Sequence, residues 1–198
     1  MFVIGLTGSI AMGKTTTARL FAEEGVPVHD ADAAVHKLYA GEAAGLIEAA
    51  FPGSTRNGTV DRVQLGKQVT GDPPALRRLE EIVHPLVRNA ERKFLRDAEV
   101  AGAKIVVLDV PLLFETGGES RVDATVVVSA PAKMQRERVL ERGVSLERLE
   151  ALLGRQMPDA EKRRRADFVV DSAQGVEHAR TQVRQILAAV AKMPARRK

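Results

Sequence analysis

Glycines, a lysine and a threonine stand at fixed spacing near the start of this sequence. Residues 8–15 read G-S-I-A-M-G-K-T, which matches the pattern G-x-x-x-x-G-K-[ST]. Gly8 and Gly13 allow the backbone to turn so that its N–H groups converge on phosphate oxygens. Lys14 can place its ammonium group on β- and γ-phosphates, and Thr15 can offer a hydroxyl to Mg²⁺. The pattern predicts an ATP-binding loop made of Gly8, Ser9, Ile10, Ala11, Met12, Gly13, Lys14, Thr15 and Thr16.

The segments on either side of this loop support the prediction. Residues 2–7 form a short apolar run, which is typical of a buried parallel strand. Residues 14–24 have helical spacing and are followed by Gly25, a residue that often ends a helix. The positive end of that helix would face the same phosphate. We therefore favour a phosphate loop over a chance match on a glycine-rich turn.

GTPases share this loop, but other parts of the chain point to a phosphotransferase. The sequence contains no N-K-x-D guanine signature, and residues 109–112 read D-V-P-L rather than D-x-x-G. Asp109 ends an expected strand over residues 104–110, where it resembles a carboxylate that holds Mg²⁺ directly or through water. The alternative, which we weigh equally, is a structural bond to the backbone of the phosphate loop. The candidate metal-binding residues are Thr15 and Asp109.

Two carboxylates, Asp30 and Asp32, follow the expected second strand at residues 26–29. In an open α/β sheet, ligands bind outside the carboxyl ends of the strands. Either carboxylate could accept a proton from a substrate hydroxyl, and either could cap a helix over residues 33–40. The pair allows both roles at once, and we favour Asp32 as the catalytic or substrate-orienting group.

Basic side chains later in the chain are candidates for phosphate binding. Arg138 and Arg142 lie four residues apart on an expected helix, and planar guanidinium groups suit phosphoryl oxygens. The alternative is a solvated helix face paired with neighbouring glutamates. The basic run at residues 162–165 is expected to be solvated, although its place also allows a lid edge near ATP. The candidates for a lid that contacts phosphate are Arg136, Arg138 and Arg142.

Five apolar strands alternate with helices, which predicts an α/β fold with a five-stranded parallel sheet flanked by helices, the P-loop NTPase fold. The strands are expected at residues 2–7, 26–29, 104–110, 124–129 and 168–170. Two helices, 73–83 and 86–101, are separated by a break at Pro85, where His84 is a structural cap or a substrate contact. We expect one domain over residues 1–198, with a helical substrate region at about 39–89 and a lid at about 143–165.

The composition narrows the classes of function. No apolar run approaches the length that crosses a bilayer, and the chain has no cysteine, which suits the reducing cytoplasm. The net charge of +4 admits nucleic-acid binding, but aromatic residues are only 4 % of the chain, so stacking platforms for single strands are sparse. We expect no membrane and no nucleic-acid partner, and a monomer or a weak homo-oligomer.

Five segments, taken in order, resemble the dephospho-coenzyme A kinase family. They are I-G-L-T-G-S-I-A-M-G-K-T (4–15), D-A-D (30–32), I-V-H-P-L-V (82–87), D-V-P-L-L-F-E (109–115), and R-Q-M-P (155–158) with K-R-R-R-A-D-F-V-V-D (162–171). The resemblance runs over nearly the whole chain. It implies transfer of the γ-phosphoryl group of ATP to the 3′-hydroxyl of the ribose of dephospho-CoA, the last step of coenzyme A biosynthesis, with Mg²⁺ as cofactor.

The resemblance also implies roles for particular residues. Asp32 would be the catalytic base, and Lys14 and Arg142 would stabilise the transferring phosphoryl group. The residues implied in substrate binding are Asp30, Asp32, His84, Arg88, Leu113, Phe114 and Glu115. The family's loop usually reads G-G-I-G-x-G-K, whereas Ser9 and Ala11 replace two of its glycines here. Ala11 implies a backbone conformation that an L-residue can adopt.

Two other functions remain open on the sequence. The first is another small-molecule kinase, acting on a nucleoside monophosphate or a sugar acid. The second is a non-catalytic ATP-binding regulator or a nucleic-acid-binding adaptor, which would bind RNA or DNA with a steep salt dependence. The acidic pair at residues 30 and 32 argues against a groove for a polyanion there.

Overall fold

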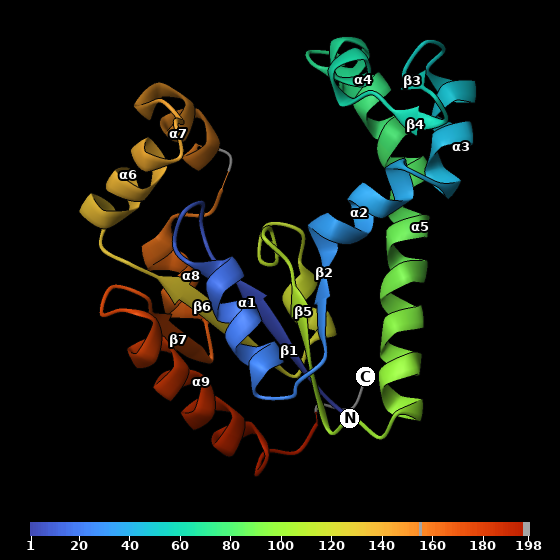
Figure 1. Ribbon diagram of the computed structural model, residues 1–198. Helices are drawn as coiled ribbons and strands as arrows, with labels where there is room; N and C mark the ends of the chain where they lie inside the picture. The colour runs from blue at the N-terminus through green and yellow to red at the C-terminus, as the bar shows by residue number, and fades with distance from the viewer. Residues whose placement is uncertain (155, 196–198) are drawn as a thin grey trace. The chain divides into compact units, whose positions relative to one another are not determined.

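The computed structural model describes residues 1–154 and 156–195 (Figure 1). The chain forms two compact units. The first, here called the sheet unit, consists of Met1–His29 and Ala98–Lys198. The second, here called the helical unit, consists of Asp30–Asp97. Arg155, which belongs to one of the segments resembling the family, lies outside the described residues, as do residues 196–198.

A five-stranded sheet forms the centre of the sheet unit, as predicted. Its strands run in the order β2-β5-β1-β6-β7, so the first strand of the chain is also the central one. β1 is parallel to β5 and to β6, and β6 is parallel to β7. The strands are β1 (Phe2–Thr7), β2 (Val28–Asp30), β5 (Ile105–Asp109), β6 (Ala124–Ser129) and β7 (Phe168–Asp171). All five lie within two residues of their predicted positions because each is a short apolar run with turn residues at its ends.

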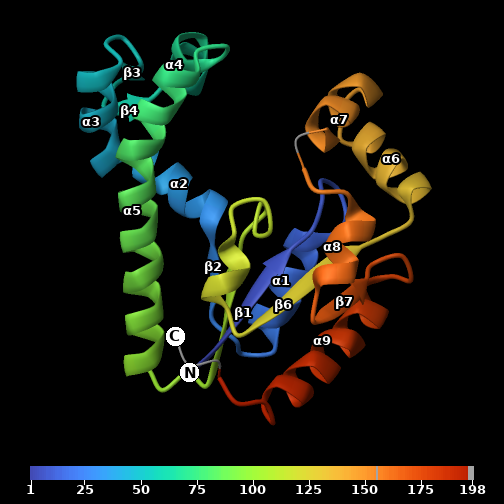
Figure 2. The same ribbon diagram turned by 180° about the vertical axis from the view of Figure 1, so that it is seen from behind.

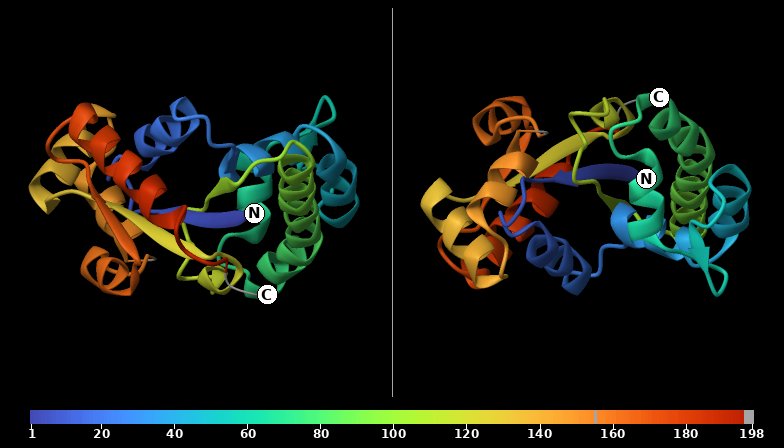
Figure 3. Two further views of the ribbon diagram at one scale, coloured as in Figure 1. Left: turned by 90° about the horizontal axis from the view of Figure 1, so that it is seen from below. Right: turned by 90° about the horizontal axis from the view of Figure 1, so that it is seen from above.

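Helices cover both faces of this sheet. The helices of the sheet unit, together with one 3₁₀ turn, are α1 (Lys14–Glu23), η1 (Gly118–Arg121), α6 (Ala132–Glu141), α7 (Leu146–Leu153), α8 (Asp159–Arg165) and α9 (Val176–Val190). Ile4 and Leu6 share one core with Phe21 of α1 and Val183 of α9, which lie on the same side of the strands (Figure 3). The opposite face of β6 carries Ser129, whose hydroxyl donates to the Asp159 carboxylate of α8.

The helical unit has a core of its own. Its elements are α2 (Ala31–Tyr39), α3 (Glu42–Ala50), β3 (Thr55–Arg56), β4 (Thr59–Val60), α4 (Arg62–Val69) and α5 (Pro73–Val100). Ile47, Leu65 and Leu79 are among the buried residues that hold these elements together. The β3–β4 hairpin, visible from both sides in Figures 1 and 2, was not predicted. Its strands have two residues each, too few to show alternation, although Asn57 and Gly58 adopt the positive φ angles that such a turn requires.

The predicted break at Pro85 is wrong, because α5 continues through this residue. Proline lacks the N–H that would bond to the carbonyl four residues earlier, which normally ends or kinks a helix. Here the apolar stripe continues across the proline: Leu79 and Val83 are buried before it, and Leu86 and Val87 pack on the same core after it. Burial of this stripe outweighs the lost hydrogen bond, and the helix continues. His84 therefore lies inside the helix rather than at its end, where it is exposed and cannot act as a cap.

The long helix is amphipathic and does not resemble a membrane span. Among the residues that the structure describes, no helix combines the length and the apolar character needed to cross a bilayer.

Candidate nucleotide-binding and phosphoryl-transfer site

The predicted phosphate loop connects β1 to α1, at the carboxyl edge of the sheet. Both of its motif glycines are required by the surrounding structure. A Cβ atom on Gly8 would lie 2.7 Å from the carbonyl oxygen of Val128. Gly13 has a φ of 94°, and a Cβ atom there would approach the Ser172 side chain to 3.1 Å. Gly13 also precedes α1 without a side-chain cap, so the first N–H groups of that helix remain available to an anion.

Ala11 adopts a more costly conformation than we expected. Its φ is 59°, in the left-handed region, which an L-residue enters at a cost of about 1–2 kcal/mol. Its methyl group is buried against Val139 of α6 and Leu149 of α7. This contact offsets part of the cost and explains how alanine replaces a glycine of the usual loop.

Lys14 and Asp109 form an ion pair at the loop. The Lys14 Nζ lies 2.6 Å from the Asp109 Oδ1, and the aspartate is only 2 % exposed. Asp109 reaches the loop because β5 pairs with β1 in a register that sets it beside Leu6. The sequence suggests two roles for Asp109, a metal ligand or a bond to the loop backbone. The ion pair with Lys14 is a third role, which was not predicted from the sequence. The metal role of Asp109 stays a prediction.

The donor set at the loop fits Mg²⁺ bound largely through phosphate. Magnesium is usually held by one or two protein oxygens, with waters and substrate phosphates as its other ligands. Asp109 supplies a carboxylate, and Thr15 supplies an exposed hydroxyl in the first turn of α1. Within the described residues, no group of three or more acidic, histidine or cysteine side chains forms a dedicated metal cage. Thr15 and Asp109 are therefore the residues that would hold the ion beside a bound triphosphate.

A cavity opens beside the loop, with a volume of about 270 Å³. Its walls come from the loop, α1, the C-terminal end of α6, the turn after β7 and the start of α9. They consist of Ala11, Gly13, Thr16, Thr17, Arg138, Glu141, Arg142, Ser172, Gly175, Val176 and Ala179. Sequence reasoning missed the wall formed by residues 172–179. This wall could have been predicted because β7 ends at the same edge of the sheet as β1, and ligands of such folds bind at that edge.

The three predicted arginines, Arg136 and Arg138 of α6 and Arg142 directly after it, lie in different surroundings. Arg136 and Arg142 are exposed, and Arg142 forms part of the cavity wall. Arg138 is half-buried and donates to the Ala11 carbonyl at 3.3 Å and to Ser172 Oγ at 3.0 Å. Contact of these side chains with phosphate stays a prediction.

The turn after β5 is held by burial. Leu113 and Phe114 are 1 % and 5 % exposed, whereas Leu112 is 40 % exposed. Gly5 makes room for the Leu113 side chain, because a Cβ atom at residue 5 would lie 2.8 Å from it. These contacts fix the turn, and the substrate contact of Leu113, Phe114 and Glu115 stays a prediction.

The expectation that residues 162–165 are solvated is wrong for Lys162, which is fully buried. Its Nζ lies 2.9 Å from the Glu115 Oε1, and the N–H of Met157 donates to the same carboxylate at 2.8 Å. Burial favours a higher pKa for the Glu115 carboxyl, but the Lys162 ammonium and the Met157 N–H outweigh it and lower the pKa. This pair anchors α8, at the end of the predicted lid, to the turn after β5.

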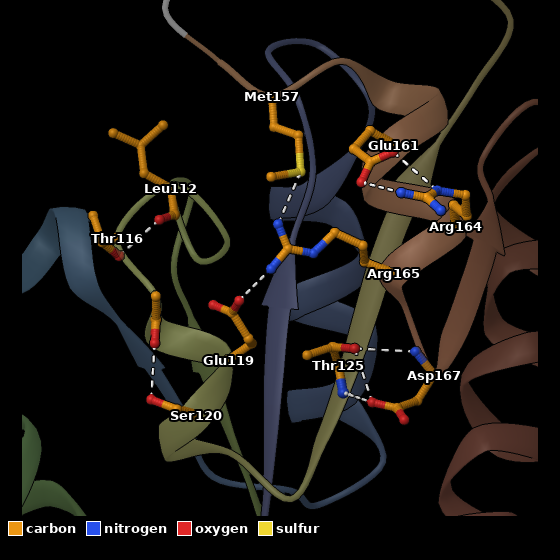
Figure 4. A network of polar contacts seen from close by, with 11 residues as sticks. Leu112, Thr116, Glu119, Ser120, Thr125, Met157, Glu161, Arg164, Arg165 and Asp167 are labelled. Atoms are coloured by element: carbon orange, nitrogen blue, oxygen red, sulfur yellow. Dashed lines mark hydrogen bonds and ion pairs between the residues drawn. The ribbon is translucent and has the colours of Figure 1, made fainter.

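Two other members of the basic run, Arg164 and Arg165, are paired on the surface of α8 (Figure 4). Arg165 lies between the Glu119 carboxylate and the Met157 sulfur, with its guanidinium 4.9 Å from the Phe114 ring centroid. Arg164 pairs with Glu161 at 2.7 Å. The run therefore ties α8 to η1 and to the turn after β5.

We expect removal of Glu115 alone to be far more damaging than removal of the whole ion pair. Glu115→Ala leaves the Lys162 charge buried without its partner, so the free energy of unfolding should fall by about 3–5 kcal/mol. Glu115→Leu combined with Lys162→Met should be close to wild type, because neither charge then has to be desolvated. Urea denaturation at pH 7 measures both values.

The same pair predicts a pH dependence. The lowered pKa of Glu115 stabilises the fold fully above the ordinary carboxyl pKa of about 4.3, and this contribution is lost as pH falls through the lower folded value. The double variant should lack this loss. Equal acid sensitivity of wild type and double variant would contradict the assignment.

The helical unit carries the remaining predicted site residues. Asp30 caps α2, since its carboxylate accepts from the N–H of Ala33 at 2.9 Å, as expected for one member of the acidic pair. Asp32 lies in the first turn of α2 and is exposed. Its side chain forms no hydrogen bond or ion pair with other described residues. His84 and Arg88 are exposed on α5, four residues apart and thus on one face.

The fold and the loop define a class of protein, the α/β P-loop kinases. A solved dephospho-CoA kinase from Campylobacter jejuni shares this fold with a TM-score of 0.66 and 23 % identity, over 95 % of this chain and 96 % of that one. A crystal structure of a Thermus thermophilus protein matches with a TM-score of 0.84 and 36 % identity, over 98 % of each chain.

Sequence comparison gives the family. The sequence profile of the family described as dephospho-CoA kinase matches residues 2–178. A dephospho-CoA kinase from Nitrobacter winogradskyi is 63 % identical over 198 residues, which cover 100 % of both chains. The chain belongs to the dephospho-CoA kinase family.

Proposed function

We propose that this protein transfers the γ-phosphoryl group of ATP to the 3′-hydroxyl of the ribose of dephospho-CoA, giving coenzyme A and ADP. The observation that carries the proposal is the phosphate loop, with Lys14 and Asp109 at its mouth, in a chain that belongs to the dephospho-CoA kinase family. The predicted resemblance to this family is thereby confirmed.

In the proposed reaction one bond forms and one bond breaks. A bond forms between the ribose 3′-oxygen and the γ-phosphorus, and the bond between that phosphorus and the β–γ bridging oxygen breaks. The hydroxyl proton passes to the Asp32 carboxylate, which is exposed and accepts no hydrogen bond from the other residues that the structure describes. Negative charge spreads over the transferring oxygens, so cationic groups stabilise the transition state.

Residues of the sheet unit supply that stabilisation. Lys14 would turn from Asp109 to the β- and γ-phosphates, and Arg142 would reach the phosphoryl group from the cavity wall. The nucleoside of ATP would occupy the cavity between the loop and residues 172–179. Thr15 and Asp109 would hold Mg²⁺, which would neutralise phosphate charge when bound. Closure of the predicted lid, residues about 143–165, would exclude water that competes as acceptor.

Substrate contacts are proposed for both units. In the helical unit we assign them to Asp30, His84 and Arg88. In the sheet unit we assign them to the exposed Leu112, the buried Leu113 and Phe114, and the partly buried Glu115. We further propose a cytoplasmic location and a monomer or weak homo-oligomer. Cell fractionation and sedimentation would test these two points.

The proposed function is tested by ADP release with and without dephospho-CoA. We expect release to depend on dephospho-CoA and on Mg²⁺, with AMP and gluconate as poor acceptors at the same concentration. Preference for either of these acceptors would identify a different small-molecule kinase. Tight ATP binding with no acceptor-dependent release, together with salt-sensitive RNA or DNA binding, would identify a non-catalytic adaptor.

A further inference from the structure

Three successive carbonyl oxygens of the phosphate loop each accept a hydrogen bond from a side chain outside the loop. Gln135 Nε2 donates to the Ile10 carbonyl at 2.8 Å. Arg138 Nη1 donates to the Ala11 carbonyl at 3.3 Å. Ser172 Oγ donates to the Met12 carbonyl at 2.7 Å. The donors come from α6 and from the residue that follows β7, between 125 and 160 residues along the chain from their acceptors.

The direction of the Ser172 hydroxyl follows from the donor inventory around it. Arg138 can only donate, and its Nη1 lies 3.0 Å from Ser172 Oγ while its Nη2 lies 2.8 Å from the Ser172 carbonyl. The hydroxyl oxygen therefore accepts from Arg138, and its single proton is free to point at the Met12 carbonyl. Arg138 thus aims Ser172 as well as contacting the loop itself.

A hydrogen bond that fixes the direction of a backbone carbonyl also fixes the direction of the N–H group of the next residue. In a planar trans peptide the C=O of one residue and the N–H of the next point in opposite directions. The bond at Ile10 consequently orients the N–H of Ala11, and the bond at Met12 orients the N–H of Gly13. These are groups of the kind that a phosphate loop offers to its anion.

We infer that Gln135, Arg138 and Ser172 are positioning residues of the nucleotide site, which hold the loop in its anion-binding shape before ATP arrives. This inference rests on the proposed binding of ATP at the loop. A loop held in advance binds phosphate more tightly because less conformational freedom is lost on binding. Gln135 is best placed to show the effect, since it is 5 % exposed and does not line the cavity.

The test compares the affinities of ATP and adenosine. Gln135→Met keeps the size of the side chain but removes the donor to Ile10, so the ATP dissociation constant should rise about tenfold, as for loss of one hydrogen bond. Adenosine carries no phosphate, so its dissociation constant should stay unchanged. Calorimetry on the full chain measures both, with Lys133→Met, an exposed change on the same helix, as control.

A second pair of variants isolates the hydroxyl at residue 172. Ser172→Thr and Ser172→Val have nearly the same shape, and only the first retains the donor to Met12. Val should bind ATP about tenfold more weakly than Thr, with equal adenosine affinity. This pair decides the question if Gln135→Met does not fold.

Two results would overturn the inference. One is unchanged ATP affinity in both Gln135→Met and Ser172→Val. The other is an equal loss of ATP and adenosine affinity, which a general disturbance of the fold would produce. Failure of the proposed reaction gives a different pattern, because wild type would then bind ATP without releasing ADP when dephospho-CoA is added.

Discussion

Lys14→Ala should lower kcat by at least about a hundredfold, the size of effect seen when a charge-stabilising group is removed from a transition state. The ammonium lies at the mouth of the loop, 2.6 Å from Asp109, so it is already beside the position that the β- and γ-phosphates would take. Alanine leaves no cation there when the transferring oxygens gain charge. Steady-state ADP release at saturating ATP and dephospho-CoA measures the effect.

Loss of activity in this variant must be separated from loss of fold. Asp109 is 2 % exposed and loses its ion-pair partner, so unfolding by urea should be followed in parallel. Lys14→Ala combined with Asp109→Asn also removes the buried negative charge and should recover stability without recovering kcat. A stable Lys14→Ala protein with kcat within tenfold of wild type would remove Lys14 from the mechanism.

Asp32→Asn should also lower kcat by at least about a hundredfold, within the range contributed by general base catalysis. Asparagine keeps the shape of the side chain but cannot accept the proton of the 3′-hydroxyl. Because Asp32 is exposed in the first turn of α2, the fold and the dissociation constant for ATP should change little. ADP release under saturating substrates gives kcat, and calorimetry gives the affinity for ATP.

Lys37→Gln is the matched control for this substitution, since it changes an exposed charge on the same helix. It should keep kcat within about twofold of wild type, the usual scale of a surface change. Full turnover by Asp32→Asn would show that another group, or none, takes the proton, and the proposed role of Asp32 would have to be given up.

Short sequence patterns predicted those features of the fold that are determined by residues close together in the chain. The phosphate loop between β1 and α1 was predictable because its glycines, lysine and threonine each have a defined role in phosphate binding. The alternation of short apolar strands with helices gave the layered sheet.

The features that the sequence did not reveal depend on tertiary contacts. A run of four basic residues indicates a solvated surface, and only packing of α8 on the sheet buries Lys162 beside Glu115. The continuity of α5 through Pro85 depends on the core beneath it. Ser172 has no motif of its own, and its role emerges when the end of β7 is set beside the loop.

The place of β1 in the sheet has a consequence for synthesis on the ribosome. β1 is the first of the five strands to be synthesised, yet it lies at the centre of the sheet. The N–H of Val3 donates to the Asp123 carboxylate, which is synthesised 120 residues later. Until β5 and β6 have been made, β1 exposes two edges of unpaired N–H and C=O groups, which favour wrong pairing. The donors that shape the nucleotide loop emerge later still, up to Ser172. Partly made chains should therefore depend on chaperones and should gain affinity for ATP only after Ser172 has emerged.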